Sequence, residues 1–200
     1  MTLTKEQITA IAKSIGLPFA VFRAFIEVES GGTGFHPDTG KIIIQFEPHI
    51  FARYLTQFKV DHKIISSLVD GKKKYTVTVG DLKFTNGVEG QTSEWNAFNV
   101  AFKMNKRAAL LSTSLGLSQV MGFHYARLGY PTVDAMWDGF KSSEYEQILG
   151  MAKFIQTDIR LLNALKKLDW AKAAELYNGA GYKVNKYDVK LANAYKKYNT

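Results

Sequence analysis

The sequence has no cysteine and few histidines, and these two shortages remove several classes of chemistry. Without cysteine the chain has no thiol nucleophile, disulfide framework, iron–sulfur cluster or cysteine-ligated zinc. Its four histidines form neither a His-Glu-x-x-His motif nor another recognised metal-ligand spacing. We therefore expect no metal and no other cofactor. A core can form without cross-links, because a chain of this length buries about 70% of its unfolded surface.

Long apolar runs are also missing. The longest fall far below the roughly 20 residues that span a bilayer. Residues 1–7 (MTLTKEQ) lack the basic region, apolar region and cleavage site of a secretory signal. The composition, 46% apolar and 22% charged, is typical of a compact globular protein. Because there is no repeat and no long linker, we expect a single domain over residues 1–200.

Charge is unevenly distributed. The formal net charge is +8, and residues 161–200 hold eight lysines against three acidic residues. A basic surface attracts polyanions such as nucleic acid, anionic lipid or an anionic wall polymer, without selecting among them.

The glycine-rich residues 31–34 follow a predicted helix and precede a turn, the reverse of the strand-loop-helix order of a phosphate loop. These glycines are predicted to end the helix, and we expect no nucleic-acid partner.

Helical periodicity dominates most of the chain. Thr4, Ser143 and Asp169 each precede apolar residues at helical spacing, as N-cap residues do, and Ser143 has a glutamate three residues later. Gly16 ends the first of these helices, and Pro18 opens another. The sequence therefore predicts several amphipathic helices at both ends of the chain.

Two segments predict strands. After a predicted turn at 37–40 (PDTG), the β-branched run 42–47 predicts a short strand. Residues 66–93 predict an inserted β-hairpin that decorates a loop, because Val and Thr alternate before a Gly-Asp pair at 80–81. The predicted fold class is α+β, mostly α-helical, with a small β region and two lobes in a single domain.

Glu29 carries the most chemical information. It shares a predicted helix face with Phe22, Phe25 and Ile26 and lies near the C-terminal end of that helix. Desolvation and the negative end of the helix dipole both raise the pKa of a carboxyl group there. A carboxylic acid that stays protonated near neutral pH can act as the general acid of glycoside hydrolysis. The competing interpretation is a solvated acid at a fraying helix end.

A second carboxyl group would complete such a site. Glu47 ends the predicted strand, and Asp38 lies in the turn before it. Retaining glycosidases hold their two carboxyl groups about 5–5.5 Å apart and inverting enzymes roughly 6.5–9.5 Å apart. The sequence leaves the stereochemistry open, and the second acid is Glu47, Asp38 or neither. Considered alone, Asp38 is typical of a turn and Glu47 of a surface acid.

Four short motifs follow one another along most of residues 20–190. They are residues 28–35 (VESGGTGF), 46–51 (FEPHIF), 114–123 (SLGLSQVMGF) and a C-terminal block formed by 169–170 (DW) and 177–179 (YNG). Together they resemble the motifs of the phage and prophage N-acetylmuramidase family, in the lysozyme-like superfamily. Leu115 stands where that family usually has Trp, and residues 66–93 have no clear counterpart in it. This insert would extend the groove, contact the outer part of the wall or decorate a loop, and we expect the last of these.

The resemblance implies an endolysin with a lysozyme-like fold. Such an enzyme hydrolyses the β-1,4 bond between N-acetylmuramic acid and N-acetylglucosamine in peptidoglycan. It also implies that Glu29 is the general acid and Glu47 the second acid of the cleft. The predicted catalytic residues are therefore Glu29 and Glu47.

The same resemblance implies a set of groove residues. Gln119, Tyr177 and Asn178 would line the sugar groove, since amide groups hydrogen-bond acetamido and hydroxyl groups and aromatic rings cover apolar sugar faces. Each also has a structural interpretation: Gln119 as a cap on nearby backbone, Tyr177 as a core residue and Asn178 as a helix stop. The remaining predicted substrate-binding residues are Phe46, His49 and Phe123.

Two alternatives remain at this point. A lytic transglycosylase shares the single glutamate but uses the 6-hydroxyl of the substrate in place of water, and so produces an anhydro sugar. A non-enzymatic cationic protein would instead bind or permeabilise an anionic envelope through its basic, aromatic C-terminus. For the endolysin we expect a monomer, made in the bacterial host cytoplasm, that acts on the cell wall after release. Its C-terminal lysines would contact anionic envelope lipid as an accessory.

Overall fold

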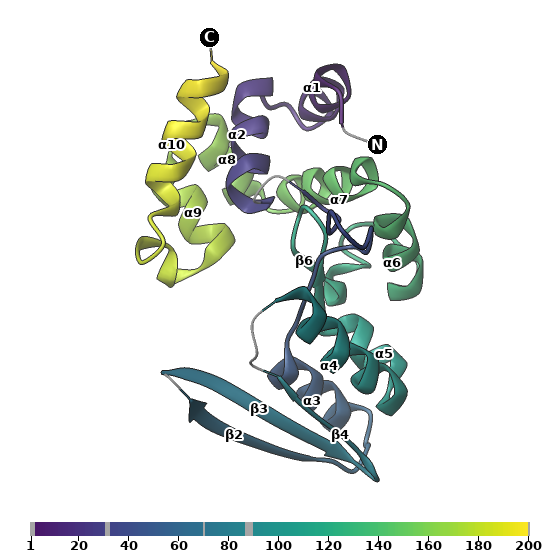
Figure 1. Ribbon diagram of the computed structural model, residues 1–200. Coiled ribbons are helices and arrows are strands. Elements are labelled where there is room, and N and C mark those ends of the chain that lie inside the picture. The colour runs from purple at the N-terminus through teal and green to yellow at the C-terminus, as the bar shows by residue number, and fades with distance from the viewer. Residues whose placement is uncertain (1–2, 31–32, 70, 87–89, 200) are drawn as a thin grey trace. The chain divides into compact units, whose positions relative to one another are not determined.

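The computed structural model describes residues 3–30, 33–69, 71–86 and 90–199. They form two compact units (Figure 1). The first comprises Met1–Phe35, Gly116–Val120 and Gly139–Thr200, and the second comprises His36–Leu115 and Met121–Asp138. Helices predominate and the strands form two small antiparallel sheets, so the predicted α+β class, mostly helical, is confirmed.

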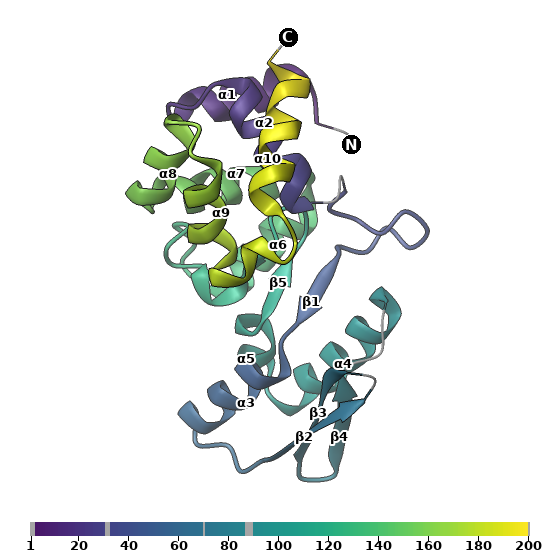
Figure 2. The same ribbon diagram turned by 90° about the vertical axis from the view of Figure 1, so that its left-hand side faces the viewer.

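The first unit is built from helices. They are α1 (Lys5–Ser14), α2 (Phe19–Ser30), α7 (Glu144–Gln156), α8 (Ile159–Lys166), α9 (Trp170–Asn178), the 3-10 helix η2 (Ala180–Lys183) and α10 (Tyr187–Tyr198). Helix α6 (Val133–Ser142) begins in the second unit and ends in this one. α2 contributes Phe22, Phe25 and Ile26 to the core, and α10 packs beside it in both views (Figures 1 and 2).

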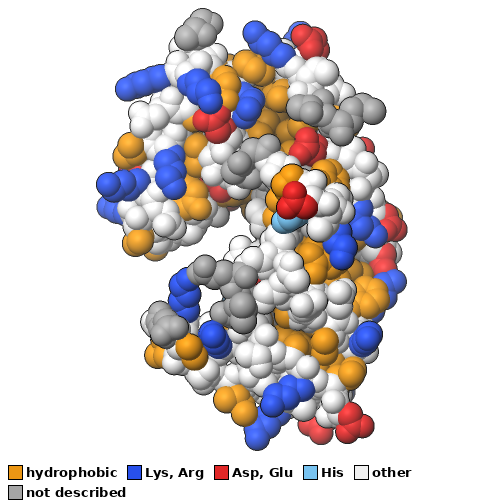
Figure 3. Space-filling model, viewed as in Figure 1, with side chains coloured by type: hydrophobic (Ala, Val, Ile, Leu, Met, Phe, Trp, Pro, Cys, Tyr) orange, Lys and Arg blue, Asp and Glu red, His pale blue; other side chains and the backbone are white. Residues whose placement is uncertain are grey.

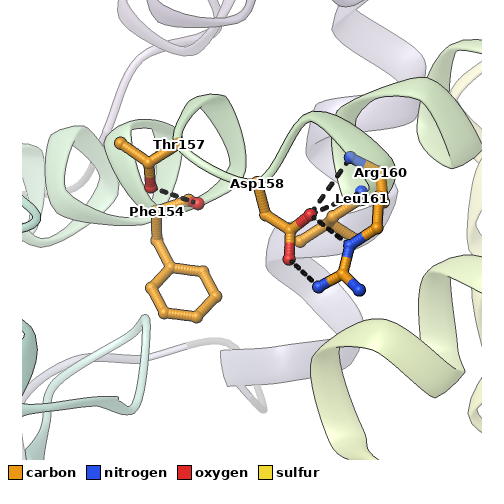
Figure 4. Close-up of polar contacts among 5 residues, drawn as sticks. All are labelled: Phe154, Thr157, Asp158, Arg160 and Leu161. Carbon is orange, nitrogen blue, oxygen red and sulfur yellow. Dashed lines mark hydrogen bonds and ion pairs between the residues drawn. The ribbon is translucent and has the colours of Figure 1, made fainter.

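The helices start where the sequence predicted. Thr4 and Gln7 form a reciprocal capping box at α1. Ser143 accepts a hydrogen bond from the backbone of residue 146, and Asp169 accepts one from the backbone of residue 172. Between α7 and α8, Asp158 accepts two backbone N–H bonds at the start of α8 and also pairs with Arg160 (Figure 4). Gly31 and Gly32, predicted to end α2, lie outside the described residues.

The second unit packs helices against short strands. It contains β1 (Ile44–Phe46), α3 (Pro48–Gln57), α4 (Gln91–Met104), α5 (Lys106–Leu111), β5 (Thr113–Leu115) and the 3-10 helix η1 (Gly122–His124). β1 pairs antiparallel with β5 in a sheet ordered β1-β5-β6, where β6 is Val120–Met121. Aromatic rings from β1, α3 and α4 meet in its core. The strand predicted over 42–47 is thus confirmed in its central part.

The predicted hairpin insertion is a three-stranded antiparallel sheet. Strands β2 (Lys63–Val69), β3 (Lys72–Val79) and β4 (Leu82–Asn86) lie in the order β2-β3-β4, and the turn at 80–81 joins β3 to β4 as predicted. The bounds 66–93 are wrong at both ends, because pairing begins at Lys63 and α4 begins at Gln91. β2 escaped detection because all its residues are exposed, so its sequence does not alternate between apolar and polar. Residues 70 and 87–89 lie outside the described part.

Gln147 holds the loop that precedes β6 within the first unit. Its fully buried side chain accepts a 2.7 Å hydrogen bond from the Leu117 N–H and donates a 2.8 Å bond to the Phe140 carbonyl. Gly116 lies so close that an added Cβ would sit 2.3 Å from the Gln147 Cδ, and its φ of +58° also favours glycine. Gly34 would clash with Gln147 in the same way. Gly116 in the third motif is therefore required by both backbone and packing.

Of the described residues, no single helix is long and apolar enough to cross a membrane. Only together do α1 and α2 have the length and apolar composition of a membrane span, and the pair is bent by 106°.

Replacing Gln147 by Met tests the importance of these two buried hydrogen bonds. Methionine has a similar length but cannot pair with the Leu117 N–H or the Phe140 carbonyl. We expect the free energy of unfolding to fall by about 3 kcal/mol in urea titrations, because two buried polar groups lose their partners. The control is Gln156→Met at the exposed end of the same helix, where we expect a change within about 0.5 kcal/mol. Equal effects of the two substitutions would contradict this role of Gln147.

Candidate functional site

Glu29 lies near the C-terminal end of α2, on the helix face that packs into the first unit. Phe25 and Phe22, one and two turns earlier on that face, are fully buried, and Ile26 is nearly so. Burying these large side chains fixes the rotation of α2 about its axis, and this rotation places the carboxyl group of Glu29 in a half-buried position. The predicted juxtaposition of an acid with aromatic core residues on one helix is confirmed.

The surroundings of Glu29 come from α9 and α10. Asn178, the last residue of α9, donates a 3.1 Å hydrogen bond from Nδ2 to Oε1 of Glu29. Burial raises the pKa of Glu29 to about 7, although the hydrogen bond from Asn178 and the positive charge of Lys190 both lower it. Tyr187 lies close enough that the charge of Glu29 raises its phenolic pKa, after burial as the main cause. Near neutral pH, Glu29 is thus distributed between its protonated and ionised forms.

Tyr177 and Gln119 hold the loop Gly116–Val120. The Tyr177 hydroxyl donates a 2.8 Å hydrogen bond to the Ser118 carbonyl, and its ring packs edge-on against Phe25 at 4.8 Å. Gln119 donates from Nε2 to the Gly116 carbonyl at 2.8 Å and has a left-handed φ of 45°. That conformation is unfavourable for a non-glycine residue, so the loop is held under local strain.

Glu47 belongs to the second unit, where it precedes α3 as its N-cap residue without capping it through its side chain. Gln45 donates a 3.1 Å hydrogen bond to Oε1 of Glu47, which lowers its pKa, but burial outweighs this bond and raises the pKa. Glu94 on α4 accepts a 2.9 Å bond from the Phe46 N–H, and its pKa is raised by burial and by the charge of Glu47. Two carboxyl groups with raised pKa values therefore lie near each other in this unit.

His49 is a neutral neighbour of Glu47. Its Nδ1 lies 3.4 Å from Oε2 of Glu47. Burial and the charges of Arg53 and Lys73 lower the pKa of His49, so the pair is a contact between a neutral ring and a carboxyl group near pH 7. The ring also lies beside Tyr75 of β3, with centroids 5.9 Å apart. His49 thus contacts the acid through its Nδ1 edge and also lies beside an aromatic ring.

The remaining candidates differ in accessibility. Phe46 is only 1% exposed, and its ring is enclosed by Phe51, Phe84 and Phe98. The prediction that Phe46 binds substrate is therefore corrected to a packing role, because a sugar cannot reach a ring inside the core. Phe123, in η1, is half-buried and so keeps part of its ring accessible.

Asp38 is exposed in the turn that residues 37–40 were predicted to form. That turn is closed by two backbone hydrogen bonds, from Gly40 to the His36 carbonyl and from His36 to the Lys41 carbonyl. Unlike Glu47, Asp38 is neither buried nor held by a described hydrogen bond.

The sequence analysis did not identify three residues that shape the surroundings of the candidate site. Glu94 and Tyr187 gain their roles from neighbours distant in the chain, and neither belongs to a recognised motif. The role of Gln147 could have been suspected from the sequence, because it is a polar residue on the apolar face of a predicted helix, where a buried amide needs hydrogen-bond partners. In the described part of the chain, no group of three or more His, Asp or Glu residues is arranged to hold a metal ion.

Comparisons with known proteins agree with the four motifs. A model of the N-acetylmuramidase family matches residues 18–199. Among solved structures, the crystal structure of a Burkholderia AP3 phage endolysin is similar, with a TM-score of 0.79 and 36% sequence identity. That likeness covers 98% of this chain and 70% of the other chain. A search of curated proteins found no match. The structural likeness confirms the lysozyme-like fold that was expected.

Glu29→Gln replaces the acid by a permanently neutral side chain of the same shape, and its effect on stability should depend on pH. Because the pKa of Glu29 is raised from 4.5 to about 7 in the folded state, folding loses stability as pH rises between these values. Glutamine avoids that loss. We expect the variant to be more stable than wild type by up to about 3 kcal/mol at pH 8, with little difference at pH 4, in urea unfolding experiments. An equal difference at both pH values would contradict a raised pKa.

Proposed function

This chain belongs to the N-acetylmuramidase family, and we propose that Glu29 is the general acid of its reaction. Members of the family are glycoside hydrolases of the lysozyme type, so the protein is a peptidoglycan hydrolase that acts on the cell wall. We propose that the bond it hydrolyses is the β-1,4 bond between N-acetylmuramic acid and N-acetylglucosamine. The observation that carries the proposal is the pKa of about 7 at a half-buried carboxyl group held by Asn178.

The hydrogen bond from Asn178 gives the two carboxyl oxygens of Glu29 different roles. Because Nδ2 donates to Oε1, the proton of neutral Glu29 resides on Oε2. Oε2 donates this proton to the glycosidic oxygen as the bond from that oxygen to the sugar C1 breaks and its electrons move to the oxygen. Water then adds to C1 and gives up a proton, which yields a reducing sugar end. The carboxylate left on Glu29 keeps the bond from Asn178 and the favourable charge of Lys190.

Glu47 is our proposal for the second carboxylate. Gln45 orients its Oε1, and His49 lies beside its Oε2, so the group has a defined position that Asp38 lacks. Once ionised, Glu47 would stabilise the positive charge that develops on the sugar or activate the attacking water. Glu94, whose pKa is raised by burial and by the charge of Glu47, is the carboxyl group beside it.

The groove residues take different parts in this proposal. Asn178 positions the acid. Tyr177 and Gln119 shape the loop Gly116–Val120, and Gln119 can also meet the sugar through its amide. Phe123 would cover an apolar sugar face, and His49 would donate a hydrogen bond. The family model runs through both compact units, so we propose one catalytic domain.

Mass spectrometry of fragments from purified, lipid-free peptidoglycan tests these assignments. We expect wild type to release fragments with reducing muramic acid ends. Glu29→Gln should lower the rate by at least roughly 100-fold, because the variant has no proton to donate. Glu47→Gln should also lower the rate, by a smaller factor. The control is Glu175→Gln, which removes an exposed acid that pairs with Lys172 and should stay within about twofold of wild type.

Two results would contradict the proposal. Equal rates for wild type and Glu29→Gln would show that this group is not the acid. Anhydro ends, lighter by one water, would mark a lytic transglycosylase, an alternative that the family and structural comparisons do not favour.

A further inference from the structure

The sheet β2-β3-β4 has two chemically different faces, and the register of its strands defines them. Residues directly opposite each other on neighbouring strands point to the same side of a sheet. Ile64 pairs with Val77, and Val77 pairs with Phe84, so these three share one face. We call this the inner face, because Val77 and Phe84 are buried and the Phe84 ring packs against the rings of the second unit's core.

The outer face carries the alternate residues, and most of them are lysines or hydroxyl residues. It consists of Lys63, Ile65, Ser67 and Val69 on β2, Lys72, Lys74, Thr76 and Thr78 on β3, and Lys83 and Thr85 on β4. The hydroxyl groups of Thr76 and Thr85 contact each other at 2.9 Å across the strands. This outer face has four lysines and no acidic residue. Asp81, in the turn beside it, is the one acid among the described residues 63–69 and 71–86.

The four lysines form two pairs. Lys63 and Lys83 flank Thr78 from the two neighbouring strands, so their backbones are about 10 Å apart at the usual strand spacing. Lys72 and Lys74 are two residues apart on β3, or about 7 Å. Within each pair the separation does not exceed the Debye length of about 10 Å at 0.1 M salt, so the two charges of a pair act on an anionic partner together.

Large apolar side chains are exposed on the same sheet. Leu68 is 72% exposed and Ile65 is 51% exposed, and Ile64 and Val69 are also exposed. All four belong to the edge strand β2, with Ile65 and Val69 on the outer face and Ile64 and Leu68 on the inner face. Figure 3 shows hydrophobic and basic side chains next to one another over the part of the molecule where Figure 1 draws this sheet. A soluble polyanion would pair with the lysines but leave the apolar side chains in water. The headgroup region of a membrane satisfies both kinds of side chain.

We propose that the outer face and edge of β2-β3-β4 bind the surface of an anionic phospholipid membrane. The lysines contact the lipid phosphates, while Ile65 and Val69 on the same face enter the interface between headgroups and acyl chains. This role is independent of the catalytic assignment. It also differs from the expected contact through the C-terminal lysines, one of which, Lys197, pairs with Glu27 at 2.9 Å.

Vesicle co-sedimentation with the full chain tests the proposal. The probes are vesicles of phosphatidylglycerol and phosphatidylcholine in equal parts and vesicles of phosphatidylcholine alone. We expect binding to the anionic vesicles that weakens with salt, and much weaker binding to the neutral ones. The variant Lys63→Gln/Lys74→Gln/Lys83→Gln should lower the affinity for anionic vesicles roughly 10- to 100-fold. Ile65→Ser/Val69→Ser should also lower it several-fold, with a loss that persists at high salt.

Two control variants remove the same charge from other places. Lys13→Gln/Lys103→Gln/Lys167→Gln takes three exposed lysines from helices or their ends outside the sheet, and Lys183→Gln/Lys186→Gln/Lys196→Gln takes three from the C-terminal region. Both should bind anionic vesicles within about threefold of wild type. If either control loses as much affinity as the sheet variant, the proposal is overturned in favour of net charge or of the C-terminus.

Hydrolysis of lipid-free peptidoglycan separates this proposal from the catalytic one. The sheet variants should keep wild-type rates there, which also shows that they are folded. If the lysine variant is not folded, the three single Lys→Gln variants replace it, and unchanged vesicle binding in all three overturns the proposal. Loss of binding to purified peptidoglycan with unchanged vesicle binding would identify a wall polymer as the partner and likewise overturn it.

Discussion

The burial of one carboxyl group, that of Glu29, is the constraint on which the chemistry of this protein depends. α2 buries Phe22, Phe25 and Ile26, and the same helix face carries Glu29 toward α9 and α10. Asn178 and Lys190 favour the ionised carboxylate, but burial favours the neutral acid more strongly and brings the pKa to about 7. A weaker core would let water in and return the acid to its ordinary pKa. A stronger ionic partner would hold it permanently ionised.

The loop Gly116–Val120 extends this constraint to its surroundings. Gln147 fixes the loop from one side with two buried hydrogen bonds, and Tyr177 fixes it from another through the Ser118 carbonyl. Because Tyr177 also packs on Phe25 and precedes Asn178, the residue that holds Glu29 and the residue that holds the loop lie on the same helix, α9. Core, acid and loop therefore form one connected arrangement within the first unit.

Sequence reasoning could predict what depends on local chemistry. The caps at Thr4, Ser143 and Asp169 and the position of Glu29 beside buried aromatic residues were found from spacing alone. The substrate-binding role predicted for Phe46 was wrong, because a motif shows which residues occur together but not which of them the core encloses. Glu94 and the partners of Gln147 could not be predicted, since their neighbours come from distant parts of the chain. The bounds of the inserted sheet failed because an exposed edge strand leaves no alternating pattern.

A carbon-13 NMR titration of the Glu29 side-chain carboxyl group tests the central claim most directly. The resonance can be assigned by its absence from the spectrum of Glu29→Gln, and its chemical shift can be followed from pH 3 to pH 9 in the folded protein. We expect a midpoint of about 7. A midpoint near the ordinary glutamate value of about 4.3 would contradict it, because Glu29 would then be ionised at neutral pH and would have no proton to donate.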